Sequence, residues 1–286
     1  MIKQPEIIIE AKALDYSYVG DEGKTEPALS GIDLTVTSGE YIALIGPNGS
    51  GKTTLLKLFN ALLAPSNGEV LVEGISTVDQ DNISRIREKC GMIFQNPDNQ
   101  LVATTVEEDI AFGLENLALP SAEIRQRVTA VAERLNLSHL LLHPPHMLSG
   151  GEKQRVAIAG VLAMQPHCIL MDEPTAMLDP AGRNDVLATV SELNRNEGVA
   201  IIHVTHFPDE AAQADRVILL SSGRLIKDGP PEEVLTDLEL LHHYGLQGTT
   251  AVELAALLRR DGFSLPPGIL HNRELVNSLC SFELKS

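Results

Sequence analysis

The chain has 286 residues and a formal net charge of −17, which argues against nucleic acid as the main ligand because phosphate backbones repel such a surface. Its three cysteines show no paired spacing, which indicates neither a disulfide framework nor a zinc site. No apolar stretch approaches the ~20 residues that span a bilayer, and residues 1–6 do not read as a signal peptide, so a partner would have to hold the protein at a membrane.

The first strand expected along the chain carries an aromatic residue near its end. Apolar and aromatic side chains alternate over residues 14–18, as in a half-buried strand, and the last of them is Tyr18. The Tyr18 ring could stack on a nucleobase, although taken alone it is better explained as an ordinary residue at a strand boundary. Residues 7–95 as a whole are expected to be rich in strands, with Asn67-Gly68 forming a hairpin turn.

A phosphate-binding loop follows the next strand. The apolar run at residues 41–45 predicts a buried parallel strand, which leads into GPNGSGKT at residues 46–53 and an apolar helical run over residues 55–63. The glycines let backbone N–H groups point at phosphate oxygens, and the dipole of the following helix favours the same anion. Lys52 would reach the β- and γ-phosphates, and the Thr53 hydroxyl is placed to bind Mg²⁺. The residues expected to contact a nucleoside triphosphate here are Gly46, Asn48, Gly49, Ser50, Gly51, Lys52, Thr53 and Thr54.

Another apolar run, at residues 91–94, places Gln95 at a strand end. From there Gln95 could reach Mg²⁺ or a water molecule, although by itself it could be an ordinary boundary residue. The chain then leaves the sheet, and a helical insertion is expected over residues 96–162. Apolar side chains in this insertion recur at helical spacing after Ser121, namely Ile124, Val128, Val131 and Leu135.

A second nucleotide-contacting sequence, LSGGEKQR, lies at residues 148–155. Ser149 and Glu152 have the Ser-x-x-Glu spacing of a capping box that opens a helix. With Gly150 and Gly151 beside the cap, the helix would present N–H groups and its dipole to an anion, without a base or metal ligand of its own. Alone, the motif could be only a well-capped helix. A chain with this motif and the phosphate-binding loop on different faces predicts a dimer that closes around ATP.

Two further strand ends supply groups for phosphate chemistry. The apolar run at residues 168–171 ends in Asp172 and Glu173. Asp172 could hold Mg²⁺ through water, and Glu173 could polarise the water that attacks the γ-phosphate. His206 follows the run at residues 201–204 and could touch the γ-phosphate. An Asp-Glu pair alone is more often a solvated turn, but here several strands deliver polar groups to one edge, where open α/β sheets bind ligands.

The C-terminal part of the chain is expected to form a separate appendage. Residues 1–240 are expected to form the ATP-binding unit, and residues 241–286 a C-terminal extension. The spacing Thr250-x-x-Glu253 predicts the start of one helix of the extension, and a last helix is expected near residues 273–279. The extension could help to pair two subunits, or it could be a small cap folded back on its own domain.

Taken in order, the motifs resemble those of the ATP-binding subunit of an ABC transporter. The resemblance covers about residues 7–235 and is carried by GPNGSGKT, Gln95, LSGGEKQR, CILMDEP, Met177-Leu-Asp179 and His206. It implies an α/β fold of the P-loop NTPase class with an antiparallel β subdomain, a helical subdomain and a small helical C-terminal extension. It also implies that the protein binds ATP with Mg²⁺ and hydrolyses the ATP.

The same resemblance implies a role for particular residues. It makes residues 46–53 the Walker A loop, Asp172 the Walker B aspartate and Glu173 the catalytic base. It makes Tyr18 the residue that stacks on adenine and Asp179 the aspartate of the D-loop. It further implies a head-to-tail dimer in which the signature residues of one subunit face the nucleotide bound to the other, these residues being Ser149, Gly150 and Gly151.

A narrower resemblance is to the energy-coupling factor (ECF) transporters, which include cobalt and vitamin importers. It is carried by residues 94–100, 105–113 and 176–183. In that family two ATPases bind a membrane T component, which carries a separate substrate-binding S component. The resemblance therefore implies a peripheral protein at the cytoplasmic face of the cell membrane, paired with itself or with a homologous ATPase.

An acidic stretch and three other protein classes stay open at this point. Glu107, Glu108 and Asp109 could lie in the groove that receives the T component, where carboxylates suit arginine-bearing helices, or they could simply begin a helix. An ordinary ABC transporter is the main alternative to an ECF importer. An ABC ATPase of DNA maintenance would need a long coiled coil between Lys52 and Leu148, and the sequence has no sustained heptads there. A ribosome-acting ABC protein would normally carry each motif twice.

Overall fold

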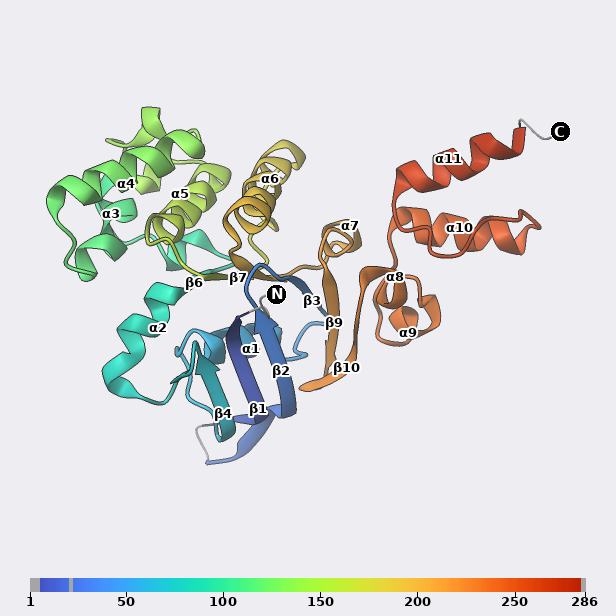
Figure 1. Ribbon diagram of the computed structural model, residues 1–286, viewed down its shortest axis with the longest axis horizontal. Coiled ribbons are helices and arrows are strands. Elements are labelled where there is room, and N and C mark those ends of the chain that lie inside the picture. Colours follow the sequence, from blue (N-terminus) through green and yellow to red (C-terminus); the bar gives the residue numbers. More distant parts are fainter. Residues whose placement is uncertain (1–5, 21–22, 284–286) are drawn as a thin grey trace, which may run out of the picture.

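The computed structural model of the chain describes residues 6–20 and 23–283. Residues 1–5, on which most of the expectation about a signal peptide rests, lie outside this range. The described strands form two sheets (Figure 1). The six-stranded sheet has the order β10-β9-β3-β8-β7-β6, and its pairs are parallel except for β9 with β10. The four-stranded sheet, in the order β2-β1-β4-β5, is antiparallel throughout. The predicted α/β core and antiparallel β subdomain are both confirmed.

The elements follow one another along the chain with these bounds. The strands are β1 (Ile7–Val19), β2 (Thr25–Thr37), β3 (Tyr41–Ile45), β4 (Asn67–Val72), β5 (Ile75–Ser76), β6 (Cys90–Ile93), β7 (Cys168–Asp172), β8 (Ala200–Val204), β9 (Arg216–Ser221) and β10 (Arg224–Gly229). The helices are α1 (Lys52–Phe59), α2 (Ile83–Lys89), α3 (Val106–Asn116), α4 (Ser121–Arg134), α5 (Gly150–Ala163), α6 (Pro180–Glu197), α7 (Pro208–Ala211), α8 (Pro231–Val234), α9 (Leu238–His243), α10 (Thr250–Arg260) and α11 (Asn272–Glu283). None of the helices in the described part of the chain is both long and apolar enough to cross a bilayer.

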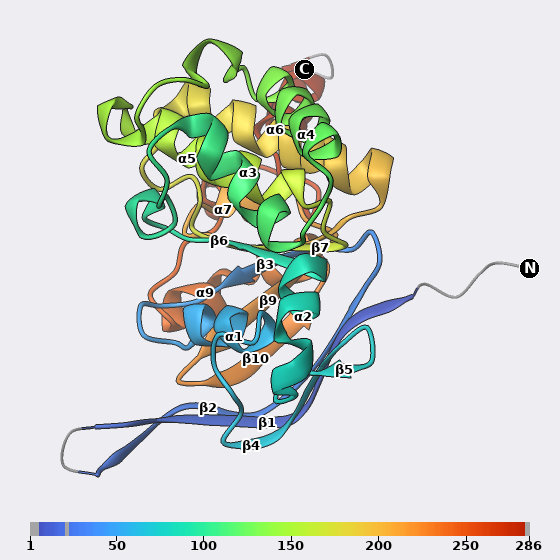
Figure 2. The ribbon, with the colours of Figure 1, turned by 90° about the vertical axis from the view of Figure 1, so that its left-hand side faces the viewer.

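The central strands of the six-stranded sheet are covered on both faces, which explains their unbroken apolar runs. Figure 2 shows α3 to α6 on one side of this sheet, and α1 with the four-stranded sheet on the other. On β3, the side chains of Tyr41, Ala43 and Ile45 join the core under the helices, and those of Ile42 and Leu44 join the core that includes α1. Apart from Tyr41 on β3 and the buried His203 on β8, the side chains of these strands are therefore apolar until the strands end.

The helices α10 and α11 of the C-terminal part pack around a small core of their own. This core is formed by Ala251, Ala255, Leu265, Ile269 and Leu275. The two helices lie beside α8 and α9, away from the helical layer over the sheet (Figure 1). They are not detached, because Val252 on α10 and Leu270 just before α11 belong to the large core under the helices.

Two helix boundaries expected from the sequence are wrong by a few residues. The apolar run at residues 55–63 is helical only as far as Phe59, because Ala61 takes a left-handed conformation with φ of 54° and the chain turns there. Helix α10 is capped by Thr249, whose hydroxyl accepts a hydrogen bond from Val252 N, and not by Thr250. Glu253 still serves the start of the helix, since its Oε1 accepts from Gly248 N at 3.1 Å.

The hairpin turn expected at Asn67-Gly68 is also wrong. These two residues begin β4, and the tight turn falls at Glu73-Gly74, between β4 and β5. Gly68 is needed for a different reason, namely that its backbone lies against the carbonyl groups of β1. A Cβ added there would lie 2.2 Å from the carbonyl oxygen of Ala13.

The two glycines Gly68 and Gly74 form a matched pair for a stability test. Both have left-handed φ angles, 77° and 76°, but a Cβ added at Gly74 would meet no atom within 4 Å. We expect Gly74→Ala to lower the free energy of unfolding by about 1–2 kcal/mol, the cost of the backbone conformation alone. Gly68→Ala should cost about 1–3 kcal/mol more, because the backbone of β1 must move. Urea unfolding of both variants measures the difference, and equal losses would contradict the close contact.

Candidate functional site

The candidate site is a cavity of about 620 Å³ at the carboxyl ends of the parallel strands. Strands β3, β8, β7 and β6 are consecutive neighbours in the sheet, so the residues that follow them meet at one edge. The cavity is lined by Tyr18, Glu26, Pro27, Ala28, Asn48, Gly49, Ser50, Gly51, Lys52, Thr53, Thr54, Gln95, Glu173 and His206. Gly46 and Asp172 are not among the lining residues and contact members of this set.

The phosphate-binding loop folds around the buried ammonium group of Lys52. Nζ donates hydrogen bonds to the carbonyl oxygens of Gly46 at 2.8 Å and Pro47 at 3.0 Å. Burial lowers the pKa of Lys52, and the carboxylates of Glu173 and Asp172 oppose that shift. Gly51 precedes the first turn of α1 with φ of 106°, and a Cβ added there would lie 2.8 Å from the carbonyl oxygen of Ala28. The loop thus brings an ammonium group and a helix N-terminus together, an arrangement that binds phosphate.

Thr53 and Asp172 form an oxygen-rich corner of the site. Thr53 Oγ1 lies 3.0 Å and 2.9 Å from the two carboxylate oxygens of Asp172. Burial raises the pKa of Asp172, and the hydrogen bond from the Thr53 hydroxyl opposes this. A hydroxyl and a carboxylate beside the amide of Gln95 are the hard oxygen ligands that Mg²⁺ prefers. These residues therefore fit a magnesium ion shared with bound phosphate.

Glu173 lies between the two other polar residues expected at strand ends. Its Oε1 is 2.6 Å from His206 Nε2, and its Oε2 accepts a hydrogen bond from Gln95 Nε2 at 2.8 Å. Its backbone N–H donates to the carbonyl oxygen of Val204 at 3.1 Å. Glu173 has a left-handed φ of 51°, a conformation that costs free energy in a residue other than glycine and recurs at functional sites. The sequence predicted the meeting of these side chains but not this backbone geometry.

Tyr18 lines the same cavity but comes from β1, in the four-stranded sheet. Its hydroxyl is 3.0 Å from Thr54 Oγ1, and the ring of Tyr16 packs against it edge-on with centroids 4.9 Å apart. Tyr18 remains 43% exposed, so an aromatic ligand can reach it. The neighbouring residues Glu26, Pro27 and Ala28 also line the cavity. No motif in the sequence marks these three residues, which lie near the start of β2.

The signature residues and Asp179 do not line the cavity. Ser149 caps α5 through a complete capping box with Glu152, as the sequence predicted, and both Ser149 and Gly150 are exposed. A Cβ added at Gly150 would meet no atom within 4 Å. Asp179 caps α6, and its Oδ1 accepts a hydrogen bond from Gly182 N at 2.7 Å. The chain therefore carries an open, capped helix N-terminus that its own phosphate cavity does not use.

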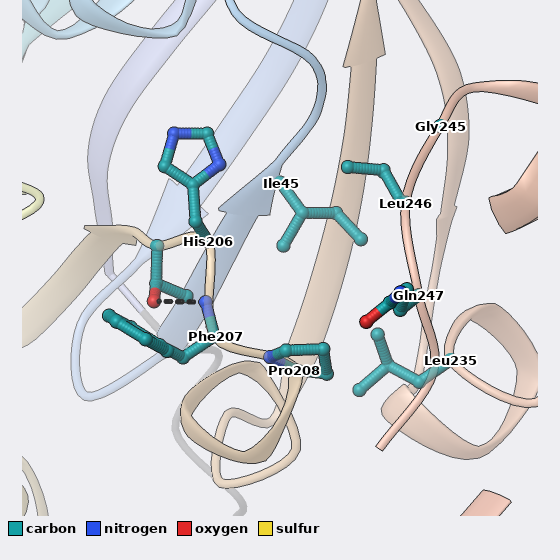
Figure 3. A pocket seen from close by; sticks show the side chains of 9 residues that line it. Ile45, His206, Phe207, Pro208, Leu235, Gly245, Leu246 and Gln247 are labelled. Atoms are coloured by element: carbon teal, nitrogen blue, oxygen red, sulfur yellow. Dashed lines mark hydrogen bonds between the residues drawn. The ribbon is translucent and has the colours of Figure 1, made fainter. Parts of the chain in front are cut away.

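A smaller cavity of about 220 Å³ lies beside His206 (Figure 3). The loop that carries His206, Phe207 and Pro208 forms one wall, and the segment 245–247 forms the other. The side chain of Ile45, at the end of β3, lies between them (Figure 3). A segment about 40 residues farther along the chain thus faces the loop after β8. No pattern in the sequence indicates this proximity.

Comparison with known proteins identifies the family to which the chain is related. A family model described as ABC transporter matches residues 29–176. The energy-coupling factor transporter ATP-binding protein EcfA1 of Caldanaerobacter subterraneus subsp. tengcongensis is 48% identical over 273 residues, which cover 96% of this chain and 99% of the relative.

Two solved structures are similar over most of the chain. The structure of cbiO1 from Clostridium perfringens, described as part of the ABC transporter complex cbiONQ, has a TM-score of 0.73 at 38% identity and covers 89% of this chain and 99% of its own. The dimeric cassette MJ0796, bound to ADP and phosphate after hydrolysis, has a TM-score of 0.73 at 32% identity, with 78% and 99% covered. Because the match to EcfA1 extends over nearly the full length of both proteins, the chain belongs to the ABC transporter family, among the ATP-binding proteins of energy-coupling factor transporters.

Proposed function

We propose that the chain is the ATPase subunit of an energy-coupling factor importer for a vitamin or a transition-metal ion. As a member of the ABC transporter family it binds ATP and hydrolyses it to power transport. The observation that carries the assignment of its catalytic centre is the position of Glu173 between Gln95 and His206, at the edge of a cavity built on a phosphate-binding loop.

The geometry supports a specific division of labour during hydrolysis. Tyr18 stacks on adenine, and the loop from Gly46 to Thr54 holds the phosphates, with Lys52 at the β- and γ-phosphates. Thr53, Asp172 and Gln95 would hold Mg²⁺, which supplies positive charge to the phosphate oxygens. Glu173 accepts the proton of the attacking water, and His206, within hydrogen-bonding distance of Glu173, orients the carboxylate and contacts the γ-phosphate.

The second half of the ATP site comes from another ATPase subunit. Ser149, Gly150 and Gly151 lie outside the cavity of their own chain, at an exposed helix N-terminus that favours an anion. In a head-to-tail dimer they face the γ-phosphate bound to the partner, with Asp179 at the subunit boundary. Hydrolysis removes the anion that joins the halves, and the dimer opens. The partner is a second copy of this chain or a homologous ATPase.

The surface near the start of α3 is the proposed docking site for a membrane T component. Of the three carboxylates expected there, Glu108 completes the capping box of α3, and Asp109 is 9% exposed and accepts hydrogen bonds from the backbone N–H groups of Val102 and Ala103. Glu107 and Glu108 are both exposed, but the carboxylate of Glu108 is already engaged in the capping box. Exposed apolar side chains surround this region, namely Val102, Phe112, Leu142 and Met147. We therefore expect a mainly apolar groove with one acidic contact.

These partners define where the protein works. A T component would hold the ATPase at the cytoplasmic face of the cell membrane as a peripheral subunit, and the T component would carry the substrate-binding S component. Nucleic acid is not expected as a partner because of the net charge of −17. An ordinary ABC transporter with its own pair of membrane subunits is the alternative.

Isolation of the tagged chain from detergent-solubilised membranes tests the proposal. We expect mass spectrometry to find a T component, an S component and any second ATPase, each missing when an untagged strain is treated in the same way. Recovery of the membrane subunits of an ordinary ABC transporter would favour the alternative. Recovery with ribosomes or nucleic acid, and without membrane proteins, would contradict both.

A further inference from the structure

The loops that carry Glu173 and His206 share a buried carboxylate beneath them. This carboxylate belongs to Glu210 on α7, which is 3% exposed. The sequence places Glu210 in the run Pro-Asp-Glu after His206, where an exposed helix start would be expected. The mechanism described above makes no use of it, and a buried carboxylate is costly unless it is well paired.

Each oxygen of Glu210 holds one of the two loops. Thr175 Oγ1 donates a hydrogen bond to Oε1 at 2.9 Å, and Thr175 lies two residues after Glu173. Thr205 Oγ1 donates to Oε2, and Thr205 directly precedes His206. The same Thr205 hydroxyl oxygen accepts a hydrogen bond from Phe207 N at 3.0 Å, the dashed line in Figure 3. One carboxylate therefore joins the loop after β7 to the loop after β8.

A cation from α6 lies against the same group. Arg183 Nε is 3.6 Å from Glu210 Oε1, and the Arg183 guanidinium lies over the ring of Phe207 with Cζ 3.7 Å from the centroid. Arg183 is four residues after Asp179, in the first turn of α6. Glu210 is thereby connected to the part of the chain that would lie at the subunit boundary.

The histidine on the other side of Glu210 does not neutralise it. His203 Nε2 is 3.4 Å from Glu210 Oε2, but burial lowers the pKa of His203 to about 3, so the ring is neutral. Its Nδ1 is 3.1 Å from the hydroxyl of Tyr41 on β3. His203 and Tyr41 are therefore neutral neighbours of Glu210 on the strands of the sheet. The groups that interact with its carboxylate are the hydroxyls of Thr175 and Thr205 and the guanidinium of Arg183.

We propose that Glu210 is a positioning residue that keeps Glu173 and His206 at their reacting distance and couples both to α6. The proposal depends on the catalytic roles given to Glu173 and His206 above. An apolar side chain at position 210 would avoid the cost of desolvation, but it could not accept hydrogen bonds from two loops at once. The phosphate-binding loop and Tyr18 lie on other elements, so we expect most of the nucleotide affinity to be independent of Glu210.

Substitution of Glu210 and its two partners tests the proposal through kinetics. Glu210→Gln removes the negative charge next to Arg183 and turns one acceptor oxygen into an N–H donor, so one threonine hydroxyl has to reverse its role from donor to acceptor. We expect kcat of the ATPase dimer to fall roughly 10- to 100-fold, the effect of a small misplacement of catalytic groups, with KM and the affinity for a fluorescent ATP analogue within about 2-fold of wild type. Thr175→Val and Thr205→Val should each give part of this loss. Because both act through Glu210, their effects should not add to that of Glu210→Gln.

Controls separate positioning from general damage and from failure of the proposed mechanism. Glu253→Gln, on α10, loses a carboxylate that also accepts a backbone hydrogen bond and should keep full turnover. If Glu210→Gln does not fold, the two threonine variants still test the proposal. Unchanged kcat in Glu210→Gln, alongside a large loss in Glu173→Gln, would overturn the role of Glu210 alone. Parallel loss of turnover and nucleotide affinity would also overturn it, because Glu210 would then support the whole site. Full turnover in Glu173→Gln would instead contradict the proposed mechanism.

Discussion

Replacement of Glu173 by glutamine should leave ATP binding nearly unchanged and slow hydrolysis at least ~100-fold, the scale of one general base. Glutamine has the same shape and keeps an oxygen that can accept a hydrogen bond from His206 Nε2, now 2.6 Å from Glu173 Oε1. It cannot take the proton of the attacking water. Lys52 and Thr53 hold the phosphates from a different strand and helix, so affinity is preserved. Single-turnover hydrolysis and binding of a fluorescent ATP analogue measure the two effects separately.

The chain supplies a closely matched control for this substitution. Glu73 also has a left-handed backbone, with φ of 47° against 51° for Glu173, and it pairs with Lys89 and His167 outside the cavity. Glu73→Gln makes the same chemical change in the same backbone conformation and should keep wild-type turnover. Near wild-type turnover in Glu173→Gln would remove Glu173 from the role of base.

Replacement of Ser149 by arginine should block closure of the ATP-bound dimer while leaving ATP binding to each subunit largely intact. Ser149 and Gly150 are exposed at the N-terminus of α5 and do not line the cavity of their own chain. A long cationic side chain there would occupy the space that the partner's γ-phosphate needs. The assay uses the Glu173→Gln background, in which ATP is hydrolysed too slowly to be used up. With ATP we expect light scattering to find dimers of this variant, and monomers of the double variant that also carries Ser149→Arg. If membrane isolation identifies a second ATPase, that subunit replaces the second copy in this assay.

The variant Ser149→Ala distinguishes the effect of a bulky side chain on dimer formation from the effect of losing the helix cap. The Ser149 hydroxyl accepts a hydrogen bond from Glu152 N, so both variants lose this cap, at a cost of about 1 kcal/mol of stability. The alanine variant adds no bulk and should still form the ATP-bound dimer. Loss of ATP binding by the isolated Ser149→Arg subunit would instead place Ser149 in its own pocket.

Most of the candidate site could be predicted because the sequence changes from apolar to polar residues where a buried strand ends. A parallel strand covered on both faces stays apolar until it leaves the core, so the first polar residue after it marks the ligand edge of the sheet. Gln95, Asp172 and His206 were located in this way, and the structure places them around one cavity or directly behind it. The capping box at Ser149 and Glu152 was equally readable, since all its partners lie within four residues.

Several predictions failed because other segments of the chain hold the residue concerned, whereas the end of α1 and the start of α10 differ for local reasons. Asn67-Gly68 has the composition of a turn, but Gly68 is set by the carbonyl groups of β1, more than 50 residues earlier. Asp109 looked like a surface charge, and it is buried because it caps the backbone of a preceding loop. No prediction was made for Glu210, whose buried carboxylate is held by Thr175 and Arg183 from other elements. No local pattern contains that information.

The backbone bond from Glu173 N–H to the carbonyl of Val204 has a consequence for how transport could be signalled to the ATP site. This hydrogen bond holds the backbone of Glu173 against the end of β8, which leads into His206. The two side chains are therefore expected to move together. Gln95 differs, because β6 is the edge strand and the chain leaves it directly for the helical layer. A swing of that layer about the end of β6 would therefore stretch the contact between the Gln95 amide and the Glu173 carboxylate, now 2.8 Å, and would also shift Gln95 relative to Thr53 and Asp172, with which it would hold Mg²⁺. A conformational change of the membrane subunit would then reach Glu173 through the side chain of Gln95.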